Sequence, residues 1–152
     1  MATRNVVKKE DTILRKQSRV VTKFDERLWE LLDDMAETMY ADEGVGLAAV
    51  QVASLKRAVV VDIQDGRGIT ELINPVIVER RGQQHELEGC LSVPGRQGYT
   101  DRPMYVKVEA LNRRGEMMTY EGEGLLARAF CHEIDHLDGI LYIDHAEMVV
   151  EE

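Results

Sequence analysis

A glutamate between two histidines, near the end of the chain, has the residue types and the spacing of a metal site. Residues 132–136 read His-Glu-Ile-Asp-His. On a helix, His132 and His136 are one turn apart, so both imidazoles can reach one metal ion, while Glu133 projects beside them, where it can accept a proton from water. The chain has only four histidines, so chance explains this spacing poorly. The alternative is a pair of core histidines bonded to backbone carbonyls, with Glu133 in solvent.

A catalytic metal site of this kind needs a third protein ligand and keeps the next position open for water. In one common pattern a third histidine lies six residues after the second, but position 142 is tyrosine. The glutamates that follow His136 lie close to the chain end. Cys90 is therefore the best candidate, and Gly89 beside it allows an unusual backbone conformation. The alternative for Cys90 is an inert, buried thiol.

A third segment that could take part in catalysis is the small-residue stretch at positions 44–51, which reads Gly-Val-Gly-Leu-Ala-Ala-Val-Gln. Its glycines and alanines allow the backbone to approach a ligand closely, and the Gln51 amide could donate to a developing oxyanion. The segment lacks a third glycine and a following Lys-Ser/Thr pair, which argues against nucleotide binding. Taken alone, it also fits a glycine-rich packing turn.

Together the three segments resemble, in order and in wording, the three signature motifs of the peptide deformylases. The resemblance spans about residues 10–145 and includes the Gly-Glu-Gly-Leu-Leu-Ala stretch before the last expected helix. The Glu-Gly-Cys-Leu-Ser segment discriminates best, because many metallopeptidases share the HExxH helix but not this cysteine. The resemblance implies an enzyme that removes the formyl group from N-formylmethionine at the start of nascent polypeptides and releases formate.

The resemblance also implies roles for individual residues. Cys90, His132 and His136 would bind one divalent metal ion, and Glu133 would be the general acid and base. Gln51 and the Leu91 backbone N–H would stabilise the oxyanion. The substrate-binding residues would be Gly44, Val45, Gly46, Glu88, Gly89, Arg128 and Ala129. The implied ion is Fe²⁺, and Zn²⁺, Ni²⁺ or Co²⁺ can also bind to two nitrogens and a sulfur.

Two positions on the last expected helix depart from the family pattern. Cys131 replaces the glutamine that many members have before the first histidine; it lies about 100° around the helix from His132, so we expect it to pack and not to ligate. Arg128 stands where an apolar residue often lines the methionine pocket, which leaves the character of that wall open. We also expect the chain to lack the extended C-terminal, ribosome-contacting helix that some members have.

Two other functions remain as alternatives. A general metalloendopeptidase of the HExxH type would cleave internal peptide bonds. A structural metal module would fill every coordination position with protein ligands, although such a site would not need Glu133 as a base.

The composition and charge limit the classes of binding partner and the compartment that we expect. The chain has 152 residues, with 19 Lys and Arg against 28 Asp and Glu, so its net charge is −9. This balance disfavours direct nucleic-acid binding. There is no apolar run of membrane-spanning length and no secretory signal, and two cysteines cannot form a secreted disulfide framework. We therefore expect a cytoplasmic monomer that meets formylated nascent peptides transiently near the ribosome.

The elements that must position these residues belong to an α+β fold. Apolar residues at helical spacing predict a helix over 25–40, capped by Asp25, and a second over 124–138 that ends at Gly139 and is buried on both sides. Strands are predicted over 58–61, 72–78, 105–111 and 117–120. Strands between two helices, without the regular strand–helix alternation of a parallel sheet, indicate this class. We further expect mostly antiparallel sheets packed around a central C-terminal helix that carries HExxH, with an N-terminal helix. We expect residues 1–152 to form a single catalytic domain.

Overall fold

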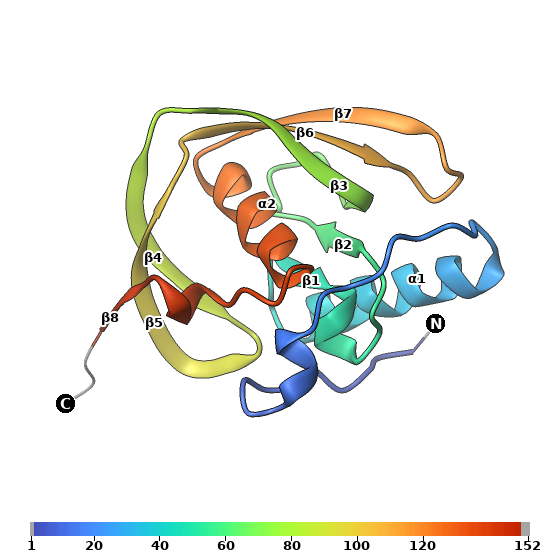
Figure 1. The fold of residues 1–152 in the computed structure, drawn as a ribbon, viewed down its shortest axis with the longest axis horizontal. Helices are drawn as coiled ribbons and strands as arrows, with labels where there is room; N and C mark the ends of the chain where they lie inside the picture. The colour runs from blue at the N-terminus through green and yellow to red at the C-terminus, as the bar shows by residue number, and fades with distance from the viewer. Residues whose placement is uncertain (1, 150–152) are drawn as a thin grey trace.

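The computed structural model of the chain describes residues 2–149, and this part has two α-helices and two antiparallel sheets (Figure 1). The α+β class and the antiparallel sheets are therefore confirmed. None of the helices in the described range is both long and apolar enough to cross a membrane. The helices are α1 (Glu26–Ala41), α2 (Leu125–His136) and the short 3₁₀ segments η1 (Thr12–Arg15), η2 (Ala49–Val52) and η3 (Tyr142–Asp144).

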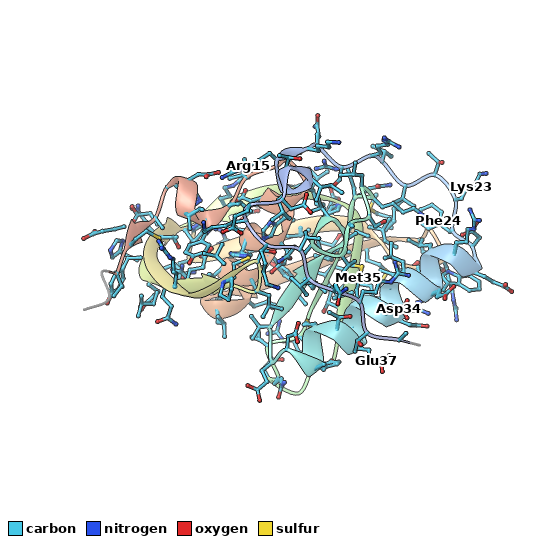
Figure 2. All side chains as sticks on the ribbon, turned by 90° about the horizontal axis from the view of Figure 1, so that it is seen from below. Arg15, Lys23, Phe24, Asp34, Met35 and Glu37 are labelled. Carbon is cyan, nitrogen blue, oxygen red and sulfur yellow. The ribbon has the colours of Figure 1, made fainter. Side chains whose placement is uncertain are left out.

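The first helix begins where the sequence predicts. The Asp25 side chain accepts a hydrogen bond from the Leu28 N–H at 3.2 Å, which satisfies one of the free donors of the first turn. The apolar face of α1, which includes Leu28 and Met35, packs against strands β1 (Gly46–Ala48) and β2 (Ala58–Val61). The N-terminal segment runs beside this helix, where Arg4 donates to Asp34 at 2.9 Å (Figure 2).

The larger sheet has the strand order β1-β2-β3-β6-β7. Its remaining members are β3 (Thr70–Arg81), β6 (Tyr105–Leu111) and β7 (Met117–Glu123). β2 and β6 have the predicted bounds, because both combine β-branched residues with buried positions. β3 is longer than the predicted 72–78, because its ends are polar and carry no hydrophobic signal.

The smaller sheet, which the sequence analysis does not predict, has the order β4-β5-β8. Its strands are β4 (Gln84–Cys90), β5 (Val93–Arg102) and β8 (Glu147–Met148). The side chains that β4 and β5 bury are mostly polar. Strands that bury polar groups do not show the alternation of apolar and polar residues on which strand prediction relies.

Helix α2 lies in the middle of the molecule, between the two sheets (Figure 1). The predicted cap at Gly139 is confirmed: its N–H donates to the His136 carbonyl at 3.2 Å, and the Ile140 N–H donates to the Asp135 carbonyl at 3.0 Å. Gly139 has a φ of +75°, the left-handed conformation that this helix ending requires. The helix is buried on both sides except at Leu125, which is 50% exposed, and at the half-buried Asp135, and these two positions correct that expectation. Cys131 packs in the core, as predicted.

Helix α2 approaches strand β7 of the larger sheet closely at Gly122. A Cβ atom at this position would lie 2.9 Å from Leu126 Cγ and 3.2 Å from Phe130 Cε2. We expect Gly122→Ala to lower the free energy of unfolding by about 1–3 kcal/mol, because neither buried side chain can retreat freely. Urea unfolding measures this loss. Thr119→Ala, at an exposed position on the same strand, should change it by less than about 0.5 kcal/mol, and equal losses in both variants would contradict the packing argument.

Candidate active site

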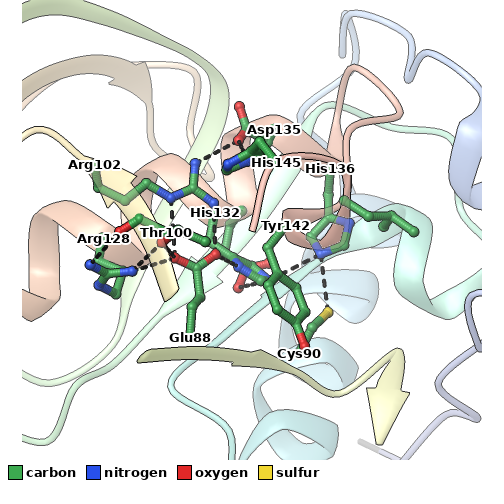
Figure 3. Close-up of polar contacts among 12 residues, drawn as sticks. Glu88, Cys90, Thr100, Arg102, Arg128, His132, Asp135, His136, Tyr142 and His145 are labelled. Atoms are coloured by element: carbon green, nitrogen blue, oxygen red, sulfur yellow. Dashed lines mark hydrogen bonds and ion pairs between the residues drawn. The ribbon is translucent and has the colours of Figure 1, made fainter. Parts of the chain in front are cut away.

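The fold brings the three predicted metal ligands together. Cys90 ends β4, and His132 and His136 lie one turn apart on α2. Cys90 Sγ is 3.4 Å from His136 Nε2, which in turn is 3.3 Å from His132 Nε2 (Figure 3). The three donor atoms all lie within 4.8 Å of one another. A cysteine from mid-chain and two histidines from the last helix therefore converge on one point.

The spacing of these donor atoms fits a metal ion. Two imidazole nitrogens on a tetrahedral zinc-like ion would be roughly 3.3 Å apart, and a nitrogen and a thiolate sulfur roughly 3.5 Å apart. The donor set, two nitrogens and one sulfur, suits a first-row transition metal. Among the described residues, Cys90, His132 and His136 are the group of metal-ligating side chains whose donor atoms lie close enough together to hold one ion.

A buried carboxylate holds the ring of His132. His132 Nδ1 contacts Glu88 Oε2 at 2.5 Å, so Nε2 faces Cys90 and His136. Metal-binding histidines almost always have such a partner on the second nitrogen. The alternative of core histidines bonded to backbone carbonyls is therefore wrong for His132.

The charges around the histidines favour a cation at this point. Burial lowers the pKa of His132, but the negative charge of Glu133 and the hydrogen bonds with Cys90 and Glu88 outweigh burial and raise that pKa well above its ordinary value. Burial, followed by the positive charge of His132, lowers the pKa of His136 well below its ordinary value. Surroundings that stabilise one positive charge between two imidazoles also suit a bound metal cation.

Glu133 is buried beside the histidines and is not in solvent, which corrects the alternative interpretation of the motif. Its Oε2 lies 4.0 Å from His132 Nε2, and its Oε1 is buried without a hydrogen-bond partner among the described residues. Burial raises the pKa of Glu133 to about 7. A carboxylate with a pKa near neutrality can both accept and return a proton, which is what general acid and base catalysis requires.

Gln51 is oriented by two hydrogen bonds. It lies on η2, where its Oε1 accepts from the Ala48 N–H at 2.9 Å and its Nε2 donates to Ser92 Oγ at 3.1 Å. The same Nε2 lies 3.5 Å from Cys90 Sγ. The amide therefore presents its donor end next to Cys90 Sγ, where it can stabilise negative charge on a bound group.

A cleft of about 670 Å³ opens above these residues. The predicted site residues that line it are Gly44, Val45, Gly46, Gln51, Glu88, Gly89, Cys90, Leu91, Arg128, Ala129, His132 and Glu133. His136 lies beneath them and has no exposed surface. The cleft combines an apolar wall with a few convergent polar groups, as small-ligand sites do.

Thr100 and Arg102, which support Glu88, were not among the residues predicted from the sequence. Arg102 donates to both Glu88 oxygens, at 3.1 and 2.6 Å, and Thr100 donates at 2.8 Å. Burial works against the charged form of Glu88, but the hydrogen bonds from His132 and Arg102 hold its pKa well below the ordinary value. Thr100 and Arg102 alternate on β5, so the signal that could have found them is a two-residue period of polar side chains.

Gly46 leaves room for the Glu133 carboxylate. A Cβ atom on Gly46 would lie 2.6 Å from Glu133 Oε2 and 2.8 Å from its Cγ. We expect Gly46→Ala to displace this carboxylate and to lower kcat by up to about 100-fold, because small displacements of a reacting group are costly. Metal content should not change, since no ligand atom moves. Steady-state kinetics with metal analysis tests this, and a fully active Gly46→Ala variant would contradict the assigned contact.

Comparisons with known proteins agree over the whole chain. The family described as polypeptide deformylase matches residues 3–152. The peptide deformylase of Acetivibrio thermocellus is 59% identical over 152 residues, which are 100% of this chain and 88% of that protein. Peptide deformylase 1 of Clostridium acetobutylicum is 56% identical and covers 95% of each chain. The crystal structure of the Thermotoga maritima peptide deformylase aligns with a TM-score of 0.90 and 43% identity, over 94% of this chain and 97% of that one.

Proposed function

Because the chain belongs to the polypeptide deformylase family, whose members are hydrolases that remove the N-formyl group from nascent peptides, we propose that the cleft above Cys90, His132 and His136 performs this reaction. The observation that carries the proposal is the convergence of one sulfur and two imidazole nitrogens within 4.8 Å of one another. This donor set lies directly beside a buried glutamate.

We propose that these three residues bind one divalent ion, and that the ion is Fe²⁺, with Zn²⁺, Ni²⁺ and Co²⁺ as further ions that the site can hold. When bound, such an ion makes water more acidic and polarises a carbonyl oxygen. Among the described residues the group has three ligands, so a bound ion would keep a coordination position for water or substrate. This count disfavours the structural metal module.

The groups around the three metal-ligating residues would have separate roles in hydrolysis. Glu133 would accept the proton of the attacking water and then return it to the departing amine, which becomes the free N-terminus. The Gln51 amide and the Leu91 backbone N–H would donate to the formyl oxygen as negative charge develops on it. The orientation of the Gln51 amide toward Cys90 supports its part.

The rest of the cleft would bind the peptide. Gly44, Val45, Gly46, Gly89 and Ala129 line the cleft together with Glu88 and Arg128. Small residues at these positions let a peptide backbone approach closely. We propose that residues 1–152 act as one catalytic domain and as a cytoplasmic monomer. It would meet nascent chains transiently near the ribosome, without binding nucleic acid or a membrane directly, consistent with the net charge of −9.

Product analysis tests this function against the endopeptidase alternative. The protein, purified anaerobically with its metal, is incubated with formyl-Met-Ala-Ser and with the unformylated peptide. We expect one formate for each free amino terminus and no cleavage of the internal bonds. Cleavage of internal bonds without release of formate would favour the endopeptidase.

A further inference from the structure

Arg128 lines the cleft, but its charge is directed away from it. The side chain is only 5% exposed. Its Nη1 donates to Glu88 Oε1 at 2.8 Å and also to Thr100 Oγ1 (Figure 3). Its Nη2 donates to Gln84 Oε1 at 3.2 Å and to the Thr100 carbonyl at 3.4 Å. Both terminal nitrogens are therefore occupied by protein acceptors on β4 and β5, so they are not available to a substrate side chain.

Arg128 donates to the Glu88 oxygen that accepts the larger number of hydrogen bonds. Oε1 of Glu88 accepts from Thr100, Arg102 and Arg128, whereas Oε2 accepts from Arg102 and faces His132. The terminal torsion of a glutamate is broad and has no strong preference of its own. Three donors on Oε1 therefore fix the plane of the carboxylate, and this plane directs Oε2 at the imidazole.

The same contacts balance the buried charge. Arg102 also donates to Asp135 at 2.7 Å, so two arginines meet two carboxylates, Glu88 and Asp135, within one network. A buried charge that loses its partner is costly. Arg128 precedes His132 by one helical turn, and both side chains therefore reach the same carboxylate from the same face of α2.

We propose that Arg128 is a positioning residue for the metal centre, which acts through Glu88 on the imidazole of His132, and that it does not select the substrate side chain by its charge. This inference rests on the proposed function, because it assigns His132 to the metal. It also answers the question that the sequence leaves open at this position, since a buried and paired guanidinium does not make the pocket wall cationic.

The test compares two variants of Arg128. Arg128→Met keeps a long side chain but removes the guanidinium donors, and Arg128→Lys keeps the positive charge. We expect Arg128→Met to weaken metal binding about tenfold, which is the low end of the effect of removing a residue that supports a metal ligand. The metal affinity of Arg128→Lys should lie between those of Arg128→Met and the wild-type protein. Chelator competition measures the affinity, and the absorption spectrum of the Co²⁺-loaded protein reports on ligand geometry. Activity on formyl-Met and formyl-Leu peptides should fall by the same factor.

Two further variants keep the test decisive. Arg113→Met removes another paired arginine, which bridges Asp33 and Glu71 away from the cleft, and should lower stability without changing metal affinity. Thr100→Val removes the hydroxyl between Arg128 and Glu88, so it replaces Arg128→Met if that variant does not fold; we expect it to weaken metal binding too. Unchanged metal affinity, with an altered preference between the two peptides, would overturn the inference. The proposed function would still stand if the wild-type protein bound metal and released formate.

Discussion

Glu133→Ala should retain its metal and lose nearly all formate release. The residue contributes no atom to the group of three ligands, so its loss should leave metal content unchanged. It is the buried carboxylate beside that group, with a pKa that burial raises to about 7, so its loss removes the proton acceptor. General acid and base groups contribute about 10²- to 10⁴-fold, and we expect a loss in kcat of about 1,000-fold or more. Formate assays with elemental analysis of the same sample measure both parts.

Glu133→Gln is the control for shape. The amide has nearly the same size, so it fills the space against Gly46 but cannot accept a proton. It should be as inactive as Glu133→Ala while folding like the wild-type protein. If either variant kept more than about a tenth of the wild-type activity, Glu133 would not be the base.

Cys90→Ser should lose tight metal binding. The substitution replaces a soft thiolate with a hydroxyl, which is a poor ligand for transition metals at neutral pH. The loss of metal affinity should exceed the roughly 10- to 100-fold loss that follows when a residue supporting a metal ligand is removed. Chelator competition measures the affinity, and the Co²⁺-loaded protein should lose the charge-transfer absorption of a cobalt–thiolate bond.

Cys131→Ser provides the matched control for the other cysteine. Cys131 packs in the core, and burial raises the pKa of its thiol to about 11, so it stays protonated. The variant should be less stable, because it buries a hydroxyl, but should keep wild-type metal affinity. If the two serine variants bound metal equally well, Cys90 would not be a ligand.

Local patterns predicted a large part of this structure. The capping aspartate at position 25, the β-branched strand 58–61 and the glycine at 139 act through neighbours in sequence, so their structures follow from short windows. The HExxH motif is also local, because one helical turn determines how its two histidines lie. The packing of Cys131 followed from its angle around the same helix.

What the sequence could not predict depends on long-range contacts between polar residues. Glu88 was associated with the substrate by resemblance, but its carboxylate oxygens contact His132, Thr100 and two arginines. These contacts require β4 and β5 to lie against α2, and neither strand has a hydrophobic pattern. The polar residues that make the small sheet hard to predict are thus those that surround Glu88, which orients the imidazole of His132 in the candidate metal site.

A metal titration of the wild-type protein tests whether formate release depends on one ion held by Cys90, His132 and His136. A chelator first removes the metal, and Fe²⁺ or Co²⁺ is then added back anaerobically while formate release from formyl-Met-Ala-Ser is followed. We expect no activity without metal, then a linear rise in formate release with added metal and a break at one ion per chain. Full formate release from the metal-free protein, or a rise unaffected by Cys90→Ser, would contradict this expectation.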